Sequence, residues 1–245
     1  IARVPQVVEN IEALREITGD YHRNLALLGA EMPLVSPEPP DIEQWTQLAL
    51  SQNMALASAI AKTQTAAEEI TRQSASGHLP TVDIVGSHAF ALMGGRFGST
   101  EIDASQIGFQ VNVPLYEGGQ AVSRTREARE RYNESLEQLE LNRRAAVRET
   151  RDAYLGVMSG ISRVKALNQA VVSTQTAVEA TENGFEVGTR TSVDVVTAKR
   201  ELFRAKRDYA RARYDYILDI LRLKQAAGSL AANDLLQVNA WLEDK

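Results

Sequence analysis

The stretch Gln106 to Gly119 reads QIGFQVNVPLYEGG, and its periodicity changes within a few residues. Polar and apolar residues first alternate with a period of two, which predicts a β-strand with one apolar face. That face would hold Ile107, Phe109, Val111, Val113 and Leu115, opposite Gln106, Gly108, Gln110 and Asn112. A helical pattern then runs to about Asn183, roughly 66 residues and about 100 Å at the usual rise. A strand joined to so long a helix indicates a membrane-spanning strand that feeds a duct or a stalk.

Composition restricts the functional classes. The 245 residues are 44% hydrophobic and 24% charged, with a net charge of -5. Acidic and basic side chains are interspersed rather than gathered in a basic patch, so we expect no nucleic-acid partner. Cysteine is absent, which excludes disulfides, thiolate zinc sites and cysteine nucleophiles. No apolar run reaches the roughly 18 residues typical of a transmembrane helix.

The first residues, IARVPQVVEN, suggest a piece of a longer protein. They have no initiating methionine, no basic n-region and no apolar h-region. They lead into what reads as the end of a helix, Val7 to Ile17, stopped by Gly19. We therefore expect a fragment or a processed form, with any signal peptide upstream.

Local signals divide the chain into five segments. Residues 1–40 hold the helix end and a linker rich in proline, and residues 41–78 a helix that Asp41 caps and that runs to about Ser74. Residues 79–117 form a hairpin, with a first strand from Thr81 to Leu92 and a loop from Met93 to Asp103. Residues 118–227 hold the long helix ended by Gly184, a turn and a returning helix. Residues 228–245 form an amphipathic tail.

Apolar residues of the long helix keep close to heptad spacing, which predicts coiled-coil packing: Leu136, Leu139, Ala146, Ala153, Val157, Ile161, Val164, Val171 and Val178. The helices that begin near Asp41 and Ser192 are each about half as long, so end to end they would match the long helix. Their free ends carry the proline-rich linker and the tail. We expect these two segments to form an equatorial belt partway along the rod.

The hairpin has two readings. Each strand has about the length that a tilted strand needs to cross a bilayer, and Val82, Ile84, His88, Phe90 and Leu92 would share one face of the first strand. A soluble hairpin with its apolar face on a helix layer alternates in the same way. Because lipid does not tolerate an open sheet edge, the membrane reading requires other copies or chains to close a barrel.

The turn GFEVGTRTSVD also has two readings. Thr191 with Asp194 is a capping-box variant, so Asp194 would satisfy free amides at a helix start. Alternatively, Glu186, Arg190 and Asp194 converge at the end of the rod and form charged rings in a symmetric oligomer. A ring of carboxylates would favour cations and hold a gate.

The sequence shows no catalytic constellation. His22, His78 and His88 lack metal-ligand spacing, and the glycines Gly94, Gly95 and Gly98 precede a strand rather than a helix, unlike a phosphate-binding loop. We expect no enzyme activity, no catalytic residues, no metal and no cofactor.

Four motifs in order resemble the TolC-like outer membrane efflux protein family. They are GHLPTVDI (77–84), VPLYEGGQ (113–120), VGTRTSVDVV (187–196) and ANDLLQVN (232–239). The resemblance covers the end of a first structural repeat and the whole second repeat. It implies a mainly α fold with one β-hairpin, in which long antiparallel coiled-coil helices of an α-barrel continue into outer-membrane β-barrel strands. A family protomer supplies two hairpins, so this chain would lack the first repeat and could not build the barrel alone.

The resemblance also implies a site and partners. In TolC-like channels a tyrosine, an arginine and two aspartates near this turn narrow the periplasmic end. Arg190 matches the arginine and Asp194 the first aspartate, whereas Phe185 replaces the tyrosine and Thr197 the second aspartate. We therefore expect a periplasmic gate at Arg190, Asp194, Phe185 and Glu186. By the same precedent the turn residues that touch an adaptor are Gly184, Val187, Gly188, Thr189 and Thr191.

The implied function is a channel component of a tripartite efflux pump or a type I secretion system in a Gram-negative envelope. It would lie in the outer membrane with a periplasmic extension and conduct small molecules or proteins passively. Its expected partners are outer-membrane lipid, two further copies in a homotrimer of the full-length form, a periplasmic adaptor and an inner-membrane transporter that chooses the cargo. The alternative is a soluble periplasmic coiled-coil scaffold or adaptor.

Overall fold

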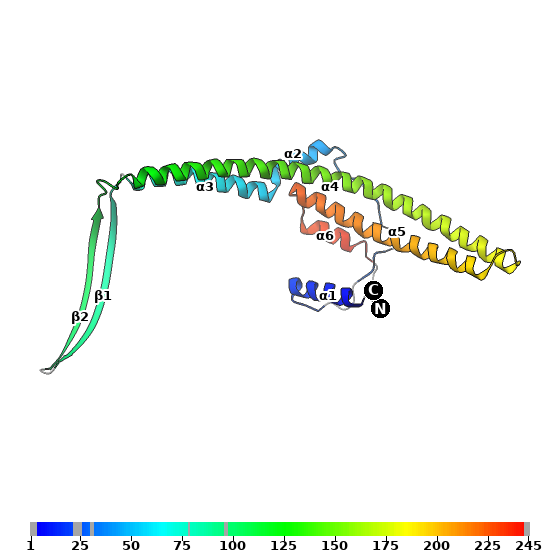
Figure 1. Ribbon diagram of the computed structural model, residues 1–245, viewed down its shortest axis with the longest axis horizontal. Helices are drawn as coiled ribbons and strands as arrows, with labels where there is room; N and C mark the ends of the chain where they lie inside the picture. Colours follow the sequence, from blue (N-terminus) through cyan, green and yellow to red (C-terminus); the bar gives the residue numbers. More distant parts are fainter. Residues whose placement is uncertain (1–3, 22–25, 30–31, 78, 96–97, 243–245) are drawn as a thin grey trace. The chain divides into compact units, whose positions relative to one another are not determined.

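The computed structural model describes residues 4–21, 26–29, 32–77, 79–95 and 98–242 (Figure 1). These residues fall into two compact units, one formed by Ile1–Asn53 with Ala146–Lys245 and the other by Met54–Ala145. Their elements are α1 (Val4–Thr18), α2 (Ile42–Gln52), α3 (Met54–Ser76), β1 (Thr81–Gly95), β2 (Gly98–Asn112), α4 (Gln120–Glu186), α5 (Ser192–Ala227) and α6 (Ala232–Asn239). The mainly helical fold with one antiparallel hairpin is confirmed. His22 and His78 lie outside the described residues.

In the unit Met54–Ala145, α3 lies along the first part of α4 (Figure 1). The Thr63 hydroxyl, which is buried, donates to the Ser135 carbonyl across the pair at 3.2 Å. At the far end of α3, an added Cβ on Gly77 would come within 2.1 Å of the Ala121 Cβ. A glycine at this position therefore lets the chain on either side of the hairpin come together.

The hairpin is longer than the sequence predicts. β1 and β2 pair from Thr81 with Asn112 to Gly95 with Gly98, so the expectation of a loop is wrong for residues 93–95 and 98–103. Backbone pairing continues the ladder past Leu92, through Met93 with Thr100 to Gly95 with Gly98. Val113 and Leu115 lie beyond β2, which ends before Pro114, a residue without an amide donor.

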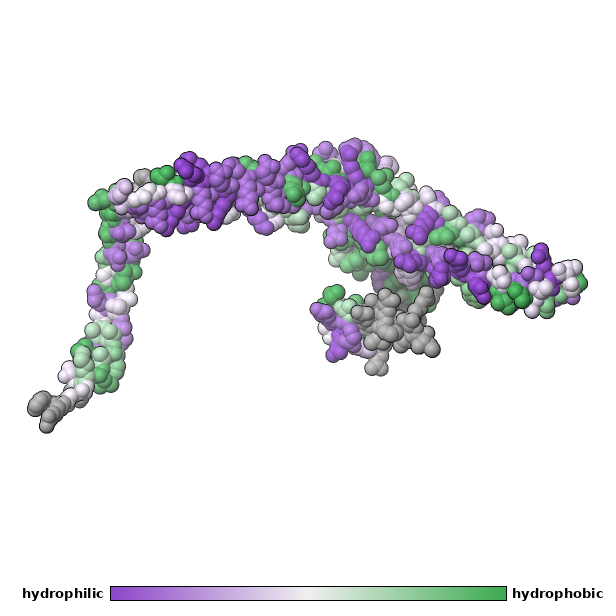
Figure 2. All heavy atoms as spheres, viewed as in Figure 1, coloured by the Kyte–Doolittle hydropathy of each residue, from purple (hydrophilic) through white to green (hydrophobic). Residues whose placement is uncertain are grey.

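The register places the apolar residues at the start of β1 and the end of β2 mainly on one face, whereas Val85 and Ile102 lie on the other. Val82 pairs with Val111 and Ile84 with Phe109, and Ile84 and Phe109 are 74% and 77% exposed. In Figure 2 the hairpin carries apolar patches, whereas the visible surface of α3 and the adjoining part of α4 is mainly hydrophilic. Further along the same face, the His88 Nδ1 lies 2.9 Å from the Ser105 Oγ. The described part of the chain thus leaves this apolar face uncovered.

The expected single helix from Asp41 to Ser74 is wrong because it breaks at Asn53. The Asn53 backbone is extended (φ -65°, ψ 121°), and its side-chain Nδ2 donates to the Ala226 carbonyl at 2.9 Å. Gly228 has φ +74°, and an added Cβ would lie 2.3 Å from the Gln52 carbonyl oxygen. The end of α5 therefore packs on the backbone at the end of α2, and the break makes room for it.

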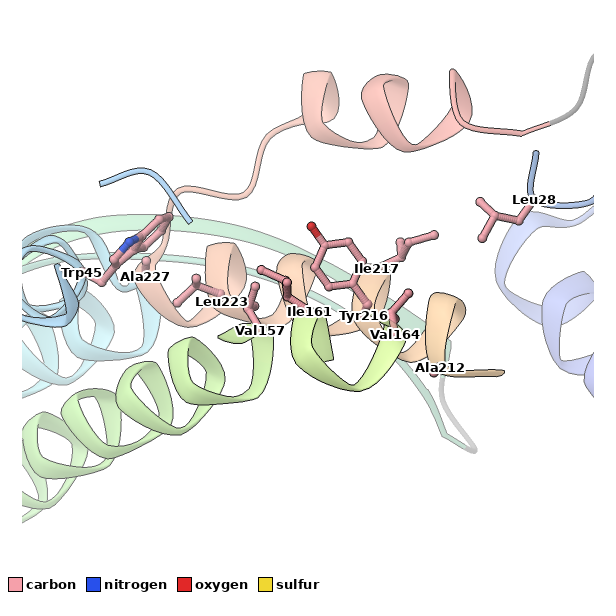
Figure 3. Packing of buried hydrophobic residues seen from close by; sticks show 10 residues of the cluster. All are labelled: Leu28, Trp45, Val157, Ile161, Val164, Ala212, Tyr216, Ile217, Leu223 and Ala227. Carbon is pink, nitrogen blue, oxygen red and sulfur yellow. The ribbon is translucent and has the colours of Figure 1, made fainter. Parts of the chain in front are cut away.

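The core of the unit Ile1–Asn53 with Ala146–Lys245 lies between α4, α5 and the segment before α2 (Figure 3). Val157 and Tyr216 are fully buried at its centre. The heptad spacing of α4 correctly identified Ala146, Val157, Ile161, Val164 and Val178 as buried, whereas Leu136 is 39% exposed. Burying a valine or isoleucine side chain stabilises a fold by about 1.5–3 kcal/mol, so Val157, Ile161 and Val164 contribute much of the stability of this core.

Side-chain donors hold the proline-rich segment on these helices. The Tyr216 hydroxyl donates to the Val35 carbonyl at 2.7 Å, the Trp45 Nε1 to the Pro39 carbonyl at 2.8 Å and the Tyr154 hydroxyl to the Pro40 carbonyl at 2.9 Å. Prolines supply no amide donors, so this segment is held by its carbonyl groups. At the C-terminal side, Lys224 of α5 pairs with Asp234 of α6. An equatorial belt in an assembly remains a prediction.

Candidate gate at the turn between α4 and α5

The candidate site is the turn that joins α4 to α5. α4 continues to Glu186, so the expectation that Gly184 ends it is wrong. The chain reverses at Gly188, whose φ of +76° lies in the left-handed region that favours glycine. Its N–H donates to the Phe185 carbonyl at 3.0 Å.

Gly184 organises the turn from within the last turn of α4. Its carbonyl accepts the amides of Thr189 and Arg190 at 2.8 and 3.0 Å, and the Thr189 hydroxyl at 3.0 Å. An added Cβ would lie 2.7 Å from the Arg190 Cγ. The absence of a side chain at Gly184 thus lets Arg190 fold back over the end of α4.

Asp194 caps the start of α5, as the capping-box reading predicts. Its carboxylate accepts the Thr191 amide and the Thr191 hydroxyl, both at 2.9 Å, while the Asp194 amide donates to the Thr191 Oγ1 at 3.3 Å. The backbone hydrogen bond from Thr191 lowers the pKa of Asp194 below its ordinary value of 3.8, and the Thr191 hydroxyl and the positive charge of Arg190 lower it further. The carboxylate is therefore ionised at neutral pH.

The remaining predicted gate residues are on the surface. Phe185 is 49% exposed, and Arg190, Glu186 and Val187 are exposed. Among the described residues no hydrogen bond or ion pair joins Glu186 to Arg190 or Asp194. The turn thus brings Arg190 near Gly184 and Asp194.

An ion pair that sequence reasoning missed joins the two helices beside this turn. The Lys199 Nζ lies 2.6 Å from the Glu182 Oε1, across from α5 to α4. Phe185, Glu186 and Val195 line an open groove of about 680 Å³ next to it. Because α4 and α5 run antiparallel, residues before the turn lie opposite residues after it. Opposite charges at such positions, as at Glu182 and Lys199, are the signal that could have predicted this pair.

Among the residues that the structure describes, no group of three or more acidic or histidine side chains is arranged to hold a metal ion. In the same part of the chain, no helix is both long and apolar enough to cross a membrane.

Comparison with known proteins agrees with the motifs. The profile of the family described as "Outer membrane efflux protein" matches residues 45–229, which is most of the chain. The chain belongs to the outer membrane efflux protein family. The match includes α3, the hairpin, α4, the candidate gate and α5.

Named relatives extend the match to nearly the whole chain. Outer membrane protein TolC of Vibrio cholerae is 36% identical over 241 residues, which is 97% of this chain and 55% of that protein. TolC of Escherichia coli is 34% identical over 240 residues, or 94% of this chain and 48% of that protein. Proteases secretion protein PrtF of Dickeya chrysanthemi is 30% identical over 207 residues, or 84% of this chain and 45% of that protein. The chain spans about half the length of these relatives.

Solved structures share the fold. CusC superposes with a TM-score of 0.67 and 16% identity over 94% of this chain and 53% of that one. The open state of the Neisseria gonorrhoeae MtrE outer membrane channel superposes with a TM-score of 0.64 and 14% identity. That match covers 90% of this chain and 49% of the MtrE chain. At these low sequence identities the superposition shows a shared fold alone.

Proposed function

We propose that this chain is the part of an outer-membrane efflux or type I secretion channel that contributes one barrel hairpin, a length of periplasmic α-barrel and the gate. The family match over residues 45–229 carries the proposal. TolC and PrtF, the named relatives, are an outer membrane protein and a protease secretion protein. The channel conducts passively, without enzyme activity.

The hairpin supports the membrane part of the proposal. Each strand has 15 residues, more than the roughly 9 to 11 that a tilted strand needs to cross a bilayer. Ile84 and Phe109, a cross-strand pair, are both mainly exposed on one face, while Asp83 and Gln110 pair on the other. Such a sheet suits a wall with lipid on one side and water on the other, and three full-length protomers, each with a second hairpin, would close it.

The turn supports the gate. Thr191 already holds the Asp194 carboxylate at the start of α5, so a symmetric assembly would present a ring of ionised carboxylates with defined positions. Arg190 lies in the same turn and would pair with an acid of a neighbouring helix. Gly184, Val187, Gly188, Thr189 and Thr191 form the surface offered to a periplasmic adaptor, behind which an inner-membrane transporter selects the cargo.

A hybrid channel tests the proposal. This chain replaces the matched 241 residues of Vibrio cholerae TolC, and the purified hybrid is placed in planar lipid bilayers beside unaltered TolC. We expect ion conductance from the hybrid. A hybrid that is extracted from membranes as a trimer but conducts nothing would contradict the channel role.

The same preparation separates the alternative, a soluble periplasmic scaffold. A channel wall needs detergent for extraction, because its apolar face lies in lipid. Release of the hybrid by high salt without detergent would favour the scaffold.

A further inference from the structure

A pocket of about 300 Å³ lies between the proline-rich segment, α5 and α6. Two tryptophans, Trp45 and Trp241, line it over a floor that includes Val157 and Leu223. Figure 3 shows Trp45 at one end of the row of buried side chains, near Leu223 and Val157. The volume is at the lower end of the range of about 300 to 1,000 Å³ that is typical of small-molecule sites. We call it the indole pocket.

The wall of the indole pocket is held in place from both sides. Ser36, Pro37 and Glu38 line it and lie between two carbonyl groups that the helices bind, those of Val35 and Pro39. Proline at position 37 has a fixed φ, which restricts the segment between these two attachments further. The segment therefore cannot easily collapse onto Val157 and Leu223, and the space beneath it stays open.

The charges around the pocket leave an acid in excess. Lys224 is the one cationic side chain among the described residues that line the pocket, and its ammonium group is already paired with Asp234. The hydrogen bond from Lys224 holds the pKa of Asp234 below its ordinary value, with help from the Ala231 amide. Glu38 is exposed at the edge of the pocket. Beside the neutralised pair, its carboxylate gives the pocket a net negative charge.

Two indoles and one uncompensated carboxylate are the groups that bind an organic cation. Indole faces attract cations through the ring quadrupole, and the attraction strengthens where water is excluded. The Trp45 Nε1–H is committed to the Pro39 carbonyl, so this indole offers the pocket its carbon surface rather than its donor. We propose that the indole pocket binds a small aromatic quaternary ammonium compound, with the cationic group against the indole surface beside Glu38 and the aromatic group on the apolar floor of Val157 and Leu223.

The chain contains its own reporter for this pocket. It has two tryptophans, and both line the pocket, so the intrinsic tryptophan fluorescence of the chain comes from this site. The purified chain is titrated with benzyltriethylammonium, with its neutral carbon isostere and with benzenesulfonate. We expect saturable quenching by the cation, binding of the neutral compound weaker by roughly tenfold, and no saturation by the anion. Equal binding of the cation and its neutral isostere would overturn the charge assignment.

Paired variants show whether the pocket is the site. Glu38→Gln should weaken binding of the cation about as much as removing the charge from the ligand does. The control Glu137→Gln makes the same change at an exposed position of α4 and should leave binding of the cation unaltered. Gln237→Arg places a positive charge at the exposed edge of the pocket and should abolish saturation. If Glu38→Gln and Gln237→Arg both bind benzyltriethylammonium as the parent chain does, the proposal is wrong. It does not depend on the channel role, since the titration requires no conductance.

Discussion

Replacing Gly228 with alanine should destabilise the chain by more than its backbone angle alone explains. Gly228 ends α5 with φ +74°, a conformation in which an L-residue costs about 1 kcal/mol more than glycine. The added methyl group would also lie 2.3 Å from the Gln52 oxygen, 2.5 Å from its carbon and 2.9 Å from the Asn53 nitrogen. All three atoms belong to the backbone, so no side-chain rotation relieves the overlap. Overpacking of this kind costs about 1–3 kcal/mol.

We therefore expect Gly228→Ala to lose about 2–4 kcal/mol of unfolding free energy, combining the two effects. The matched control is Gly188→Ala, because Gly188 has nearly the same φ, +76°, but an added Cβ meets nothing within 4 Å. Its expected loss is about 1 kcal/mol. Urea denaturation followed by circular dichroism at the helical band measures both. Equal losses would refute the close approach of α5 to the end of α2.

Three further predictions concern the core, the cap and the gate. Tyr216→Phe should lose about 1–2 kcal/mol, because the Val35 carbonyl loses the hydroxyl that donates to it, and urea denaturation would check this. The folded-state pKa of Asp194 is lowered, so its cap stabilises α5 above pH 3.8, and this stabilisation is lost as the pH falls below that value. Amide exchange at residues 192–195, followed against pH, should show this loss in the parent chain and no such loss in Asp194→Asn. In the hybrid channel, Arg190→Ala should raise the conductance and Asp194→Ala should lower the preference for cations, and unchanged bilayer currents in both variants would show that the gate lies elsewhere.

Periodicity predicted the elements that depend on local pattern. The period of two around Ile84 and Phe109 gave the hairpin and its apolar face, and the heptads around Val157 and Ile161 gave the buried side of α4. Thr191 and Asp194 were recognised because a capping box needs residues only three positions apart. Each of these signals lies within one element.

The errors arose where distant residues decide the structure. The break at Asn53 depends on contacts with Ala226 and Gly228, which no window around Asn53 contains. The strand pairing at residues 93–95 and 98–103 joins β1 to β2 across the hairpin, and no pattern within either strand predicted it. The pair of Lys199 with Glu182 and the indole pocket likewise require α4, α5 and the proline-rich segment to be assembled first.

The proposed channel requires that one face of the hairpin meets lipid and that the other meets water. Adjacent residues of β1 test it, because Ile84 and Asp83 point to opposite faces and the chain has no cysteine of its own. Ile84→Cys and Asp83→Cys are introduced separately into the hybrid channel, which is reconstituted in lipid vesicles and exposed to a membrane-impermeant maleimide. We expect rapid labelling at position 83 and protection at position 84 until detergent is added. Equal labelling of both positions in intact vesicles would contradict it.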